Sequence, residues 1–335
     1  MTKAKHHVLV LTDDKPGHVS QSLGIGHALD SSIEAQHHHI SISVRFKSLR
    51  FLMRYLVNTL PHKLLIPTLP VFYRINGDYK NYHNPIIISS GGNTLYASIV
   101  LKSLTGGLNL YSGSPKQFNP SMIDLIYTVV PIPNLANNVV LDLPPVNIEK
   151  IMPRSSANIY TLLIGGNGAG YQYSKKDWAI LVTAIKEIAF SHNIKWLITT
   201  SRRSGVFIEE LLDQLNEPSV IEELTLYGRK PEKVMSRYLQ EAEVIFCTED
   251  SLTMVSEAIY SGKKVYTLHP KVYQPDQNDA NALEKYDSSG FIERHPIESI
   301  GDVSVNKKKL IQVLPNINKQ IYAPVLKKLR SIPSK

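Results

Sequence analysis

The sequence predicts an α/β protein with two doubly wound domains, in which helices cover both faces of a parallel sheet. Short apolar or β-branched runs alternate with helix-length segments throughout the 335 residues, a pattern typical of parallel sheets. The length exceeds that of one typical domain. A proline-rich break between residues 142 and 157 separates two such series.

The expected strands are short and mostly apolar. In the first half they are 7–12, 37–44, 86–89, 108–111 and 124–130, and in the second half 159–164, 195–200, 220–227, 243–247 and 264–268. Helix candidates lie near 20–30, 93–104, 177–192, 206–216, 232–242, 252–261 and 278–287. Doubly wound sheets bind ligands at the carboxyl ends of their strands. We therefore expect both Rossmann-like domains to present their strand-to-helix loops to one cleft.

The proline-rich break suits a linker between domains. Pro144, Pro145 and Pro153 prevent regular strand pairing there. We expect an N-terminal domain over residues 1–147 and a C-terminal domain over residues 148–315. The basic tail is expected to be helical over 306–331. We expect residues 316–335 to form a C-terminal helix that packs back across the hinge.

Composition narrows the classes of function. The single cysteine, Cys247, excludes an internal disulfide and a cysteine-based zinc site, and it indicates a reducing compartment. The apolar run at the N-terminus is too short for a signal peptide, and nowhere do about 18 apolar residues follow one another. We therefore expect a cytoplasmic protein. The net charge of +8 favours anionic partners, or serves solubility alone. No nucleic-acid-binding motif is present, so nucleic acid is not an expected partner.

Two loops of the first half carry candidate chemistry. Around the turn after the first strand the sequence places acidic, basic and amide side chains together with a glycine: Asp13, Asp14, Lys15, Gly17, His18 and Gln21. The helix that follows offers backbone N–H groups to an anion. After strand 86–89, Gly91 and Gly92 allow close approach of a ligand, and Asn93 or Thr94 can cap the next helix. Plain capped turns are the alternative at both places.

Three loops of the second half suit a nucleotide. Gly165, Gly166 and Asn167 end a strand in a flexible turn, although Tyr171 replaces the third glycine of a dinucleotide motif and no Walker loop is present. Ser201, Arg202 and Arg203 follow the next strand, where paired arginines suit phosphate oxygens. A surface position is the alternative for both arginines.

The most specific loop is the one before helix 252–261. Its residues are polar and stand at the start of that helix: Asp250, Ser251, Thr253, Ser256 and Glu257. Hydroxyl and N–H groups at a helix N-terminus suit a diphosphate, and Glu257 can accept both ribose hydroxyls. The alternative is that Ser251 only caps the helix.

These motifs together resemble one family. The ordered segments D-x-K-P-G-H-x-x-Q, I-G-G, T-T-S-R-R and E-D-S-x-T-M-V-S-E-A-x-x-x-G-K-x-V span residues 12–268. They are similar to the mitochondrial-fission ELM1-like family of bacterial glycosyltransferases and their plant relatives. The S-E-A-x-x-x-G segment resembles the sugar-nucleotide-binding helix of GT-B enzymes. The chain departs from the family at Asp14, where a glycine is usual, and at Ser204–Gly205, where Thr-Pro is common.

The resemblance implies a GT-B-like fold and a glycosyltransferase that uses a nucleotide-activated sugar, in cell-envelope polysaccharide or lipopolysaccharide synthesis. No D-x-D motif is present, so we expect metal-independent transfer without a cofactor. The catalytic base is expected among Asp13, Asp14 and His18, with Asp13 first because it holds the position of the family's aspartate. Lys15, Gly17, Gln21, Gly91, Gly92 and Asn93 are expected to contact the acceptor or the sugar. The alternatives are a sugar-nucleotide 2-epimerase and a non-catalytic, membrane-associated adaptor.

Residues 45–74 suggest contact with the inner face of an anionic membrane. The segment contains seven basic residues and no acidic one. Apolar residues at helical spacing predict one apolar helix face: Phe46, Leu49, Leu52, Met53, Leu56, Val57 and Leu60. A second apolar stretch, 64–72, contains Pro67 and Pro70 and is a poor helix or strand. A lipid-linked acceptor would require such contact, and a core-facing helix with a basic outer side is the alternative.

Overall fold

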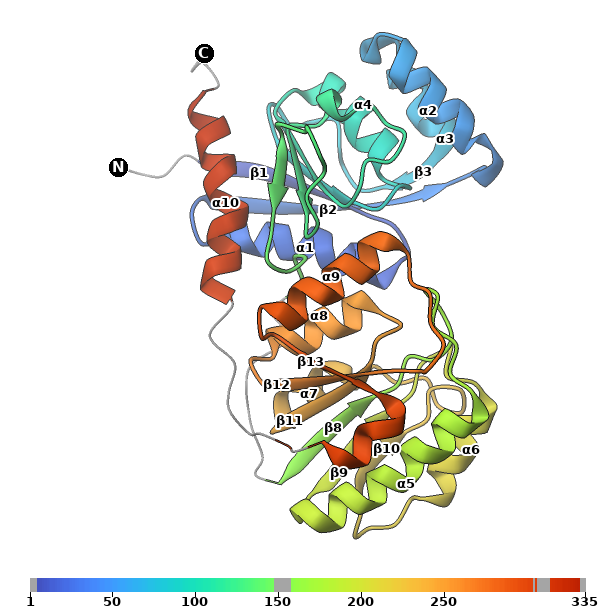
Figure 1. The fold of residues 1–335 in the computed structure, drawn as a ribbon. Helices are drawn as coiled ribbons and strands as arrows, with labels where there is room; N and C mark the ends of the chain where they lie inside the picture. The colour runs from blue at the N-terminus through green and yellow to red at the C-terminus, as the bar shows by residue number, and fades with distance from the viewer. Residues whose placement is uncertain (1–4, 148–157, 304, 306–313, 332–335) are drawn as a thin grey trace. The chain divides into compact units, whose positions relative to one another are not determined.

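A computed structural model describes residues 5–147, 158–303, 305 and 314–331 of the chain. The chain divides into two compact units: unit 1 comprises Met1–Ile148 with Leu314–Lys335, and unit 2 comprises Glu149–Val313. Each unit has its own sheet (Figure 1). Residues 148–157 of the expected linker and 306–313 of the expected tail helix lie outside the described residues. Within the described ranges, no helix is both long enough and apolar enough to cross a lipid bilayer.

In its described part, unit 1 forms a seven-stranded sheet in the order β3-β2-β1-β4-β5-β6-β7. Its strands are β1 (Lys5–Thr12), β2 (Glu34–Val44), β3 (Tyr73–Asn76), β4 (Ile86–Ser90), β5 (Leu108–Ser112), β6 (Leu125–Thr128) and β7 (Asn138–Val140). Only β2 and β3 pair antiparallel; the other neighbours are parallel. Strand order reverses between β1 and β4, and sheets of this type bind ligands beside such a reversal.

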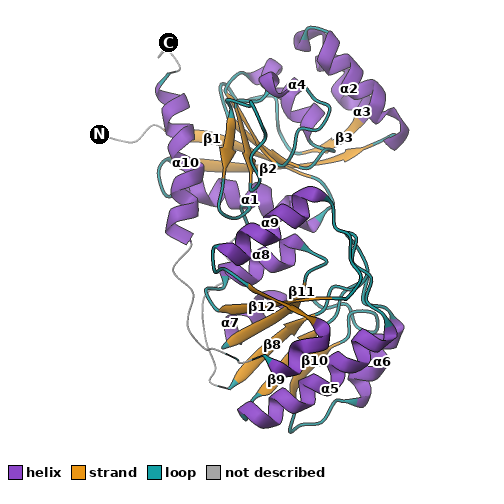
Figure 2. Ribbon diagram, viewed as in Figure 1, coloured by secondary structure: helices purple, strands orange, loops and turns teal. Residues whose placement is uncertain are grey.

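Helices cover both faces of this sheet (Figure 2). From β1 and from β4 the chain proceeds in opposite directions along the sheet. Because both connections are right-handed crossovers, α1 (Pro16–Asp30) and α4 (Leu95–Thr105) lie on opposite faces. α10 (Leu314–Arg330) packs beside α1. It buries Ile317, Ile321 and Val325 at four-residue spacing, and the Tyr127 hydroxyl donates to the Ile321 carbonyl at 2.9 Å. The last helix therefore belongs to unit 1, although unit 2 precedes it in the chain.

The chain between β2 and β3 is helical. It forms η1 (Lys47–Leu49), α2 (Arg50–Thr59), η2 (His62–Thr68) and α3 (Leu69–Phe72). The stretch 64–72, which we judged a poor helix, is therefore helical, and burial of Leu65, Leu69 and Phe72 in the core explains its apolar sequence. The apolar face predicted for this segment is split. Met53 and Val57 are buried, whereas Phe46, Leu52 and Leu60 are exposed.

Unit 2 contains, among its described residues, six parallel strands in the order β10-β9-β8-β11-β12-β13. They are β8 (Ile159–Leu163), β9 (Lys195–Thr199), β10 (Ile221–Thr225), β11 (Val244–Thr248), β12 (Lys264–His269) and β13 (Glu293–Pro296). Every residue of β11 is buried, as expected for a central strand covered on both faces. Here the order reverses between β8 and β11.

The helices of unit 2 follow the same rule of handedness. α5 (Lys175–His192) and α6 (Val206–Gln214) lie on one face, and α7 (Met235–Glu241), α8 (Leu252–Tyr260) and α9 (Gln277–Ser288) lie on the other. α5 begins at a capping box: Asp177 N donates to Ser174 Oγ at 3.1 Å, and Ser174 N donates to Asp177 Oδ2 at 2.7 Å.

The predicted fold class, two doubly wound α/β domains, is confirmed. The structure adds three strands that the sequence did not predict, β3, β7 and β13. Each has three or four residues, too short for an apolar alternation to be recognised. α1 begins at Pro16 instead of residue 20, because proline at the first helical position fits the backbone of a helix start.

Candidate functional site

In unit 1, the carboxylate of Asp13 is the centre of a hydrogen-bonded network at the carboxyl edge of the sheet. Asp13 follows β1 directly and is 6% exposed. Its Oδ2 accepts from Nδ1 of His18, in the first turn of α1, at 2.9 Å, and from Nδ2 of Asn93, which follows β4, at 3.0 Å. Its Oδ1 accepts the backbone N–H of Lys15 at 3.1 Å. Asp13 thus joins the two loops on either side of the strand reversal.

The network keeps the Asp13 carboxyl ionised. Burial raises its pKa, but the hydrogen bond and charge of His18, with the hydrogen bonds from Lys15 and Asn93, bring the pKa below the ordinary value of 3.8. An ionised carboxylate only accepts hydrogen bonds, so Nδ1 of His18 carries the proton. In a neutral His18 this leaves the lone pair on Nε2, as a general base requires.

Three neighbours fix the positions of His18 and Asn93. Gly91 has a φ of +79°, and a Cβ there would collide with the His18 ring. Nη2 of Arg50 donates to Asn93 Oδ1 at 2.7 Å, and the buried Tyr73 hydroxyl donates to the Asn93 carbonyl at 2.9 Å. The three predicted residues Asp13, His18 and Asn93 are therefore brought together.

The other residues expected in this site have different surroundings. Asp14 is exposed and makes no hydrogen bond with any described residue. Gly17 lies in the first turn of α1, and Gly92 has open space where a Cβ would stand. Gln21 Oε1 accepts from Ser90 Oγ at 2.7 Å and from Ser112 Oγ at 3.1 Å. The Gln21 oxygen therefore links α1 to the ends of β4 and β5.

Beside this network lies a pocket of about 270 Å³, which we call the α2 pocket. Its polar lining comprises Lys15, Arg50, Arg54, Asn93, Ser114 and Lys116. Its apolar lining includes Val44, Met53, Tyr73, Leu95, Tyr111 and Phe118. The sequence singled out Arg50 and Arg54 only as part of a membrane surface, and nothing in the sequence pointed to Lys116 or Tyr111. These side chains meet through contacts between loops that are distant along the chain.

In unit 2, the three predicted loops interlock at the strand reversal. Gly165 N donates to Thr248 Oγ1 at 2.8 Å, and Thr248 Oγ1 donates to Asp250 Oδ1 at 2.6 Å. A Cβ on Gly165 would collide with the Asp250 carboxylate. Ser201 Oγ donates to the Gly165 carbonyl. The loops after β8, β9 and β11 therefore form one rigid surface.

The two adjacent arginines have different environments. The Arg203 guanidinium forms an ion pair with Asp250, whose side chain is fully buried. Burial raises the pKa of the Asp250 carboxyl, although Thr248 and Arg203 both oppose this shift. Arg202 is exposed and makes no ion pair with any described residue. Of the two, Arg202 has the guanidinium available to a phosphate.

Among the remaining predicted residues of unit 2, some are bonded to the backbone of the unit and others are partly exposed. Ser251 caps α8 by accepting Met254 N at 3.4 Å, and buried Ser256 donates to the Leu252 carbonyl at 2.6 Å. Thr253 and Glu257 are partly exposed in the first turns of α8. Asn167 Oδ1 accepts from Tyr173 N at 2.8 Å. An ion pair that the sequence did not reveal, between buried Glu249 and partly exposed Arg294, anchors the end of β11 through bonds of 2.7 and 2.8 Å.

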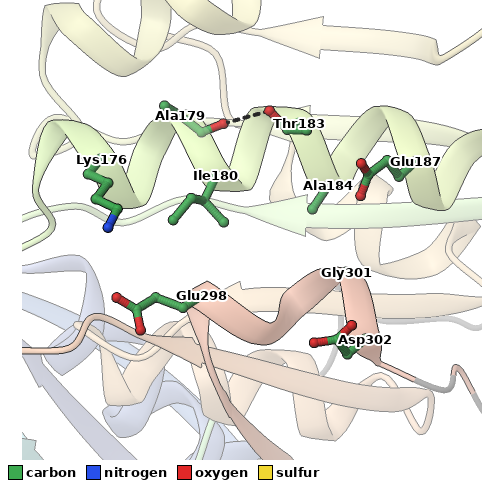
Figure 3. Close-up of a pocket in the computed structure, with 9 residues that line it drawn as sticks. All are labelled: Lys176, Ala179, Ile180, Thr183, Ala184, Glu187, Glu298, Gly301 and Asp302. Carbon is green, nitrogen blue, oxygen red and sulfur yellow. Dashed lines mark hydrogen bonds between the residues drawn. The ribbon is translucent and has the colours of Figure 1, made fainter.

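Unit 2 has a hollow between α5 and η5 (Ile297–Asp302) (Figure 3). Glu187, Glu298 and Asp302 line it, and Lys176 is the one basic residue of its lining. The excess of carboxylates repels a diphosphate. This hollow is therefore poorly suited to an anion.

Comparison with known sequences identifies relatives. The sequence profile of the family described as "Mitochondrial fission ELM1" matches residues 16–285. The uncharacterized protein RP120 of Rickettsia prowazekii (strain Madrid E) is 23% identical over 216 residues. The alignment covers 62% of this chain and 57% of RP120, so the chain spans little more than half the length of this relative.

Solved structures resemble the chain over almost its whole length. The UDP-GlcNAc 2-epimerase from Methanocaldococcus jannaschii gives a TM-score of 0.56 at 11% identity, covering 98% of this chain and 99% of that one. MurG from Acinetobacter baumannii gives 0.49 at 16% identity, covering 98% and 100%. At such identities the likeness to the epimerase concerns the fold alone. The predicted GT-B-like fold is confirmed.

Proposed function

The chain belongs to the mitochondrial fission ELM1 family, and from the geometry of its two sheet edges we propose that it is a glycosyltransferase using a nucleotide-activated sugar. One observation carries the proposal: buried, ionised Asp13 holds the His18 imidazole at the edge where doubly wound sheets bind ligands. A carboxylate–imidazole pair of this kind activates a hydroxyl group for attack.

His18 is the base in this proposal, and Asp13 orients it. Nε2 of His18 takes the proton of the acceptor hydroxyl, whose oxygen attacks C1 of the sugar as the bond from C1 to the diphosphate oxygen breaks. The sequence ranked Asp13 first as the base. Its low pKa and its three hydrogen-bond donors support the orienting role instead. Asp14 lies outside the network.

Unit 2 holds the donor in this proposal. The diphosphate binds Arg202, which can donate two parallel hydrogen bonds, and the N-terminus of α8, whose dipole favours an anion. Glu257 accepts the ribose hydroxyls, and the surface made by Gly165 and Ser201 supports the nucleotide. These groups stabilise the charge of the leaving diphosphate, so the transfer requires neither a metal nor a cofactor.

The acceptor is a saccharide or a lipid-linked saccharide of the cell envelope in this proposal, and unit 1 reaches the inner membrane. Twelve large hydrophobic side chains are exposed in the described residues, and seven of them lie within 46–71: Phe46, Phe51, Leu52, Tyr55, Leu60, Leu64 and Val71. Basic Lys47 and Lys63 lie in the same segment. An exposed apolar surface with basic residues suits an anionic lipid surface.

Two alternatives make different demands on the site. A 2-epimerase would need acid–base groups on both faces of the sugar and would release no nucleotide. A non-catalytic adaptor would tolerate loss of His18. The epimerase alternative is supported by the likeness of fold to the epimerase from Methanocaldococcus jannaschii.

A thermal-shift screen against UDP-, GDP-, dTDP-, ADP- and CMP-sugars tests the proposal. A ligand at about 100 times its Kd adds roughly 2.7 kcal/mol to the free energy of unfolding. We expect one nucleotide class to raise Tm, and Arg202→Ala to weaken its binding about 10- to 100-fold. Arg229→Ala, which removes another exposed arginine of unit 2, is the control. If no nucleotide sugar raises Tm, the proposal is wrong.

A further inference from the structure

All the charged side chains that line the α2 pocket are basic. Lys15, Arg50, Arg54 and Lys116 contribute four basic groups, and no acidic side chain lines the pocket. Attack by a hydroxyl group does not by itself require such a concentration of positive charge. Basic groups around a partly apolar hollow attract an anion more strongly than they would in open water.

One hydrogen-bond donor of Arg54 has no partner among the described residues. One of its terminal nitrogens donates to Gln117 Oε1, but its Nε is buried and has no hydrogen-bond partner among the described residues. An unsatisfied buried donor costs about 1–3 kcal/mol, and native proteins contain few of them. Arg54 also lines the α2 pocket, so a small movement of its guanidinium would bring this N–H to an anion there.

The loop opposite α2 holds Lys116 in an unfavourable backbone conformation. Its φ of +51° lies in the left-handed region, where a non-glycine residue is uncommon. Residues held in this way concentrate at ligand sites. Here the conformation places Lys116 on the wall of the pocket together with Arg50 and Arg54.

We propose that the α2 pocket binds a phosphate group of the acceptor. The inference rests on the proposed function, since the acceptor is the molecule whose hydroxyl His18 deprotonates. Arg50 donates to Asn93, and Asn93 donates to Asp13, which orients His18. Phosphate binding and the base therefore share one network. The phosphate belongs either to a soluble sugar phosphate or to a lipid headgroup.

Titration calorimetry on the full chain tests this with inorganic phosphate, glucose 1-phosphate and uncharged glucose as probes. We expect the two phosphates to bind and glucose not to bind. Arg54→Gln should weaken phosphate binding about 10- to 100-fold, as expected for loss of a charged hydrogen bond. Lys116→Gln, in an exposed loop, is a second variant in case Arg54→Gln does not fold. Lys80→Gln, at an exposed basic residue of unit 1 outside both the pocket and the segment 46–71, should bind phosphate like the unaltered chain.

Arg202→Ala separates this inference from the proposed function. Loss of phosphate binding in Arg54→Gln but not in Arg202→Ala, with the reverse for the nucleotide, supports both. Nucleotide binding that depends on Arg202, with phosphate binding unaffected by Arg54→Gln and Lys116→Gln, overturns the pocket assignment alone. Absence of nucleotide binding with phosphate binding still dependent on Arg54 overturns the donor proposal and leaves the phosphate site.

Vesicles distinguish the two sources of the phosphate. Cosedimentation with phosphatidic acid vesicles but not with phosphatidylcholine vesicles, lost in Arg54→Gln and retained in Lys80→Gln, assigns the site to a lipid phosphate. Binding of glucose 1-phosphate without such cosedimentation assigns it to a soluble sugar phosphate. If neither probe binds in a manner that depends on Arg54 or Lys116, the inference is wrong.

Discussion

Both units are doubly wound sheets, but they differ in the residues placed at the strand reversal. In unit 1 the buried acid, Asp13, follows β1 and accepts a hydrogen bond from Asn93, which follows β4. In unit 2 the buried acid, Asp250, follows β11 and packs against Gly165 after β8. Asp13 is paired with a histidine and has a lowered pKa, whereas Asp250 is paired with an arginine and has a raised pKa because of its burial.

This difference indicates which chemistry the carboxyl edge of each sheet can support. A carboxylate that orients an imidazole leaves a nitrogen available for proton transfer. A carboxylate paired with a permanently charged guanidinium cannot take part in proton transfer through that partner, and it serves instead to lock loops together. We therefore propose that unit 1 supplies the proton transfer of the reaction and that unit 2 supplies the binding surface for the donor.

The largest effect should come from removing the base. We expect His18→Gln to lower kcat about 10²- to 10⁴-fold, the usual contribution of a general base. Asp13→Asn should lower kcat as well, with a changed pH dependence, because it disturbs the orientation and tautomer of His18. If Asp13 were itself the base, activity would persist on acidification down to below pH 3.8. A rate profile with that limit would reverse the roles of the two residues.

The two adjacent arginines of unit 2, Arg202 and Arg203, should affect stability and binding separately. Arg203→Ala leaves the buried Asp250 carboxylate unpaired, so we expect the free energy of unfolding to fall by about 1–3 kcal/mol. Arg202→Ala should leave unfolding unchanged and weaken only nucleotide binding. Urea unfolding followed by tryptophan fluorescence reports on unit 2, because both tryptophans, Trp178 and Trp196, lie there. Equal stability of the two variants would show that the pair with Asp250 is not what locks the loops.

Exposed apolar residues of the two units should differ in their effect on membrane binding. Phe51 of α2 is 72% exposed and Phe190 of α5 is 62% exposed. We expect Phe51→Ser to reduce flotation with anionic vesicles about tenfold, equivalent to roughly 1.4 kcal/mol. Phe190→Ser is the matched control and should float like the unaltered chain. Flotation that is absent at low salt, or equally reduced in both variants, would contradict the membrane surface of unit 1.

The smallest expected effect is a pH dependence of stability. The pKa of Asp13 is lowered in the folded chain, so its contribution is present above the unfolded value of 3.8 and is lost as pH falls through the folded value. Asp13→Asn should therefore cost about 1 kcal/mol near neutral pH and less at pH 3. Asp14→Asn, at the exposed neighbour, should cost nothing at either pH. A pH-independent cost of Asp13→Asn would argue against the ionised network.

Much of the fold could be predicted from the sequence, because alternating apolar runs report burial directly. The family and the fold class are confirmed, and the missed strands are short edge strands such as β7. The positions of the site residues relative to one another depend on long-range contacts, which no local sequence pattern contains. Arg50 reaches Asn93 across 43 positions, and Arg203 is engaged by Asp250 across 47. The sequence predicted candidate loops at the ends of strands, but it could not show which arginine would be engaged by Asp250.

The most direct test of the central claim is the product formed from the nucleotide sugar that the thermal-shift screen selects. The full chain is incubated with that donor, labelled with ¹³C in the sugar, and with an extract of bacterial envelope saccharides and lipids, and the products are followed by NMR. We predict acceptor-dependent release of nucleoside diphosphate with the label on a new glycoside, and loss of both in His18→Gln. A donor inverted at C2 without nucleotide release, or turnover unaffected by His18→Gln, would contradict the account.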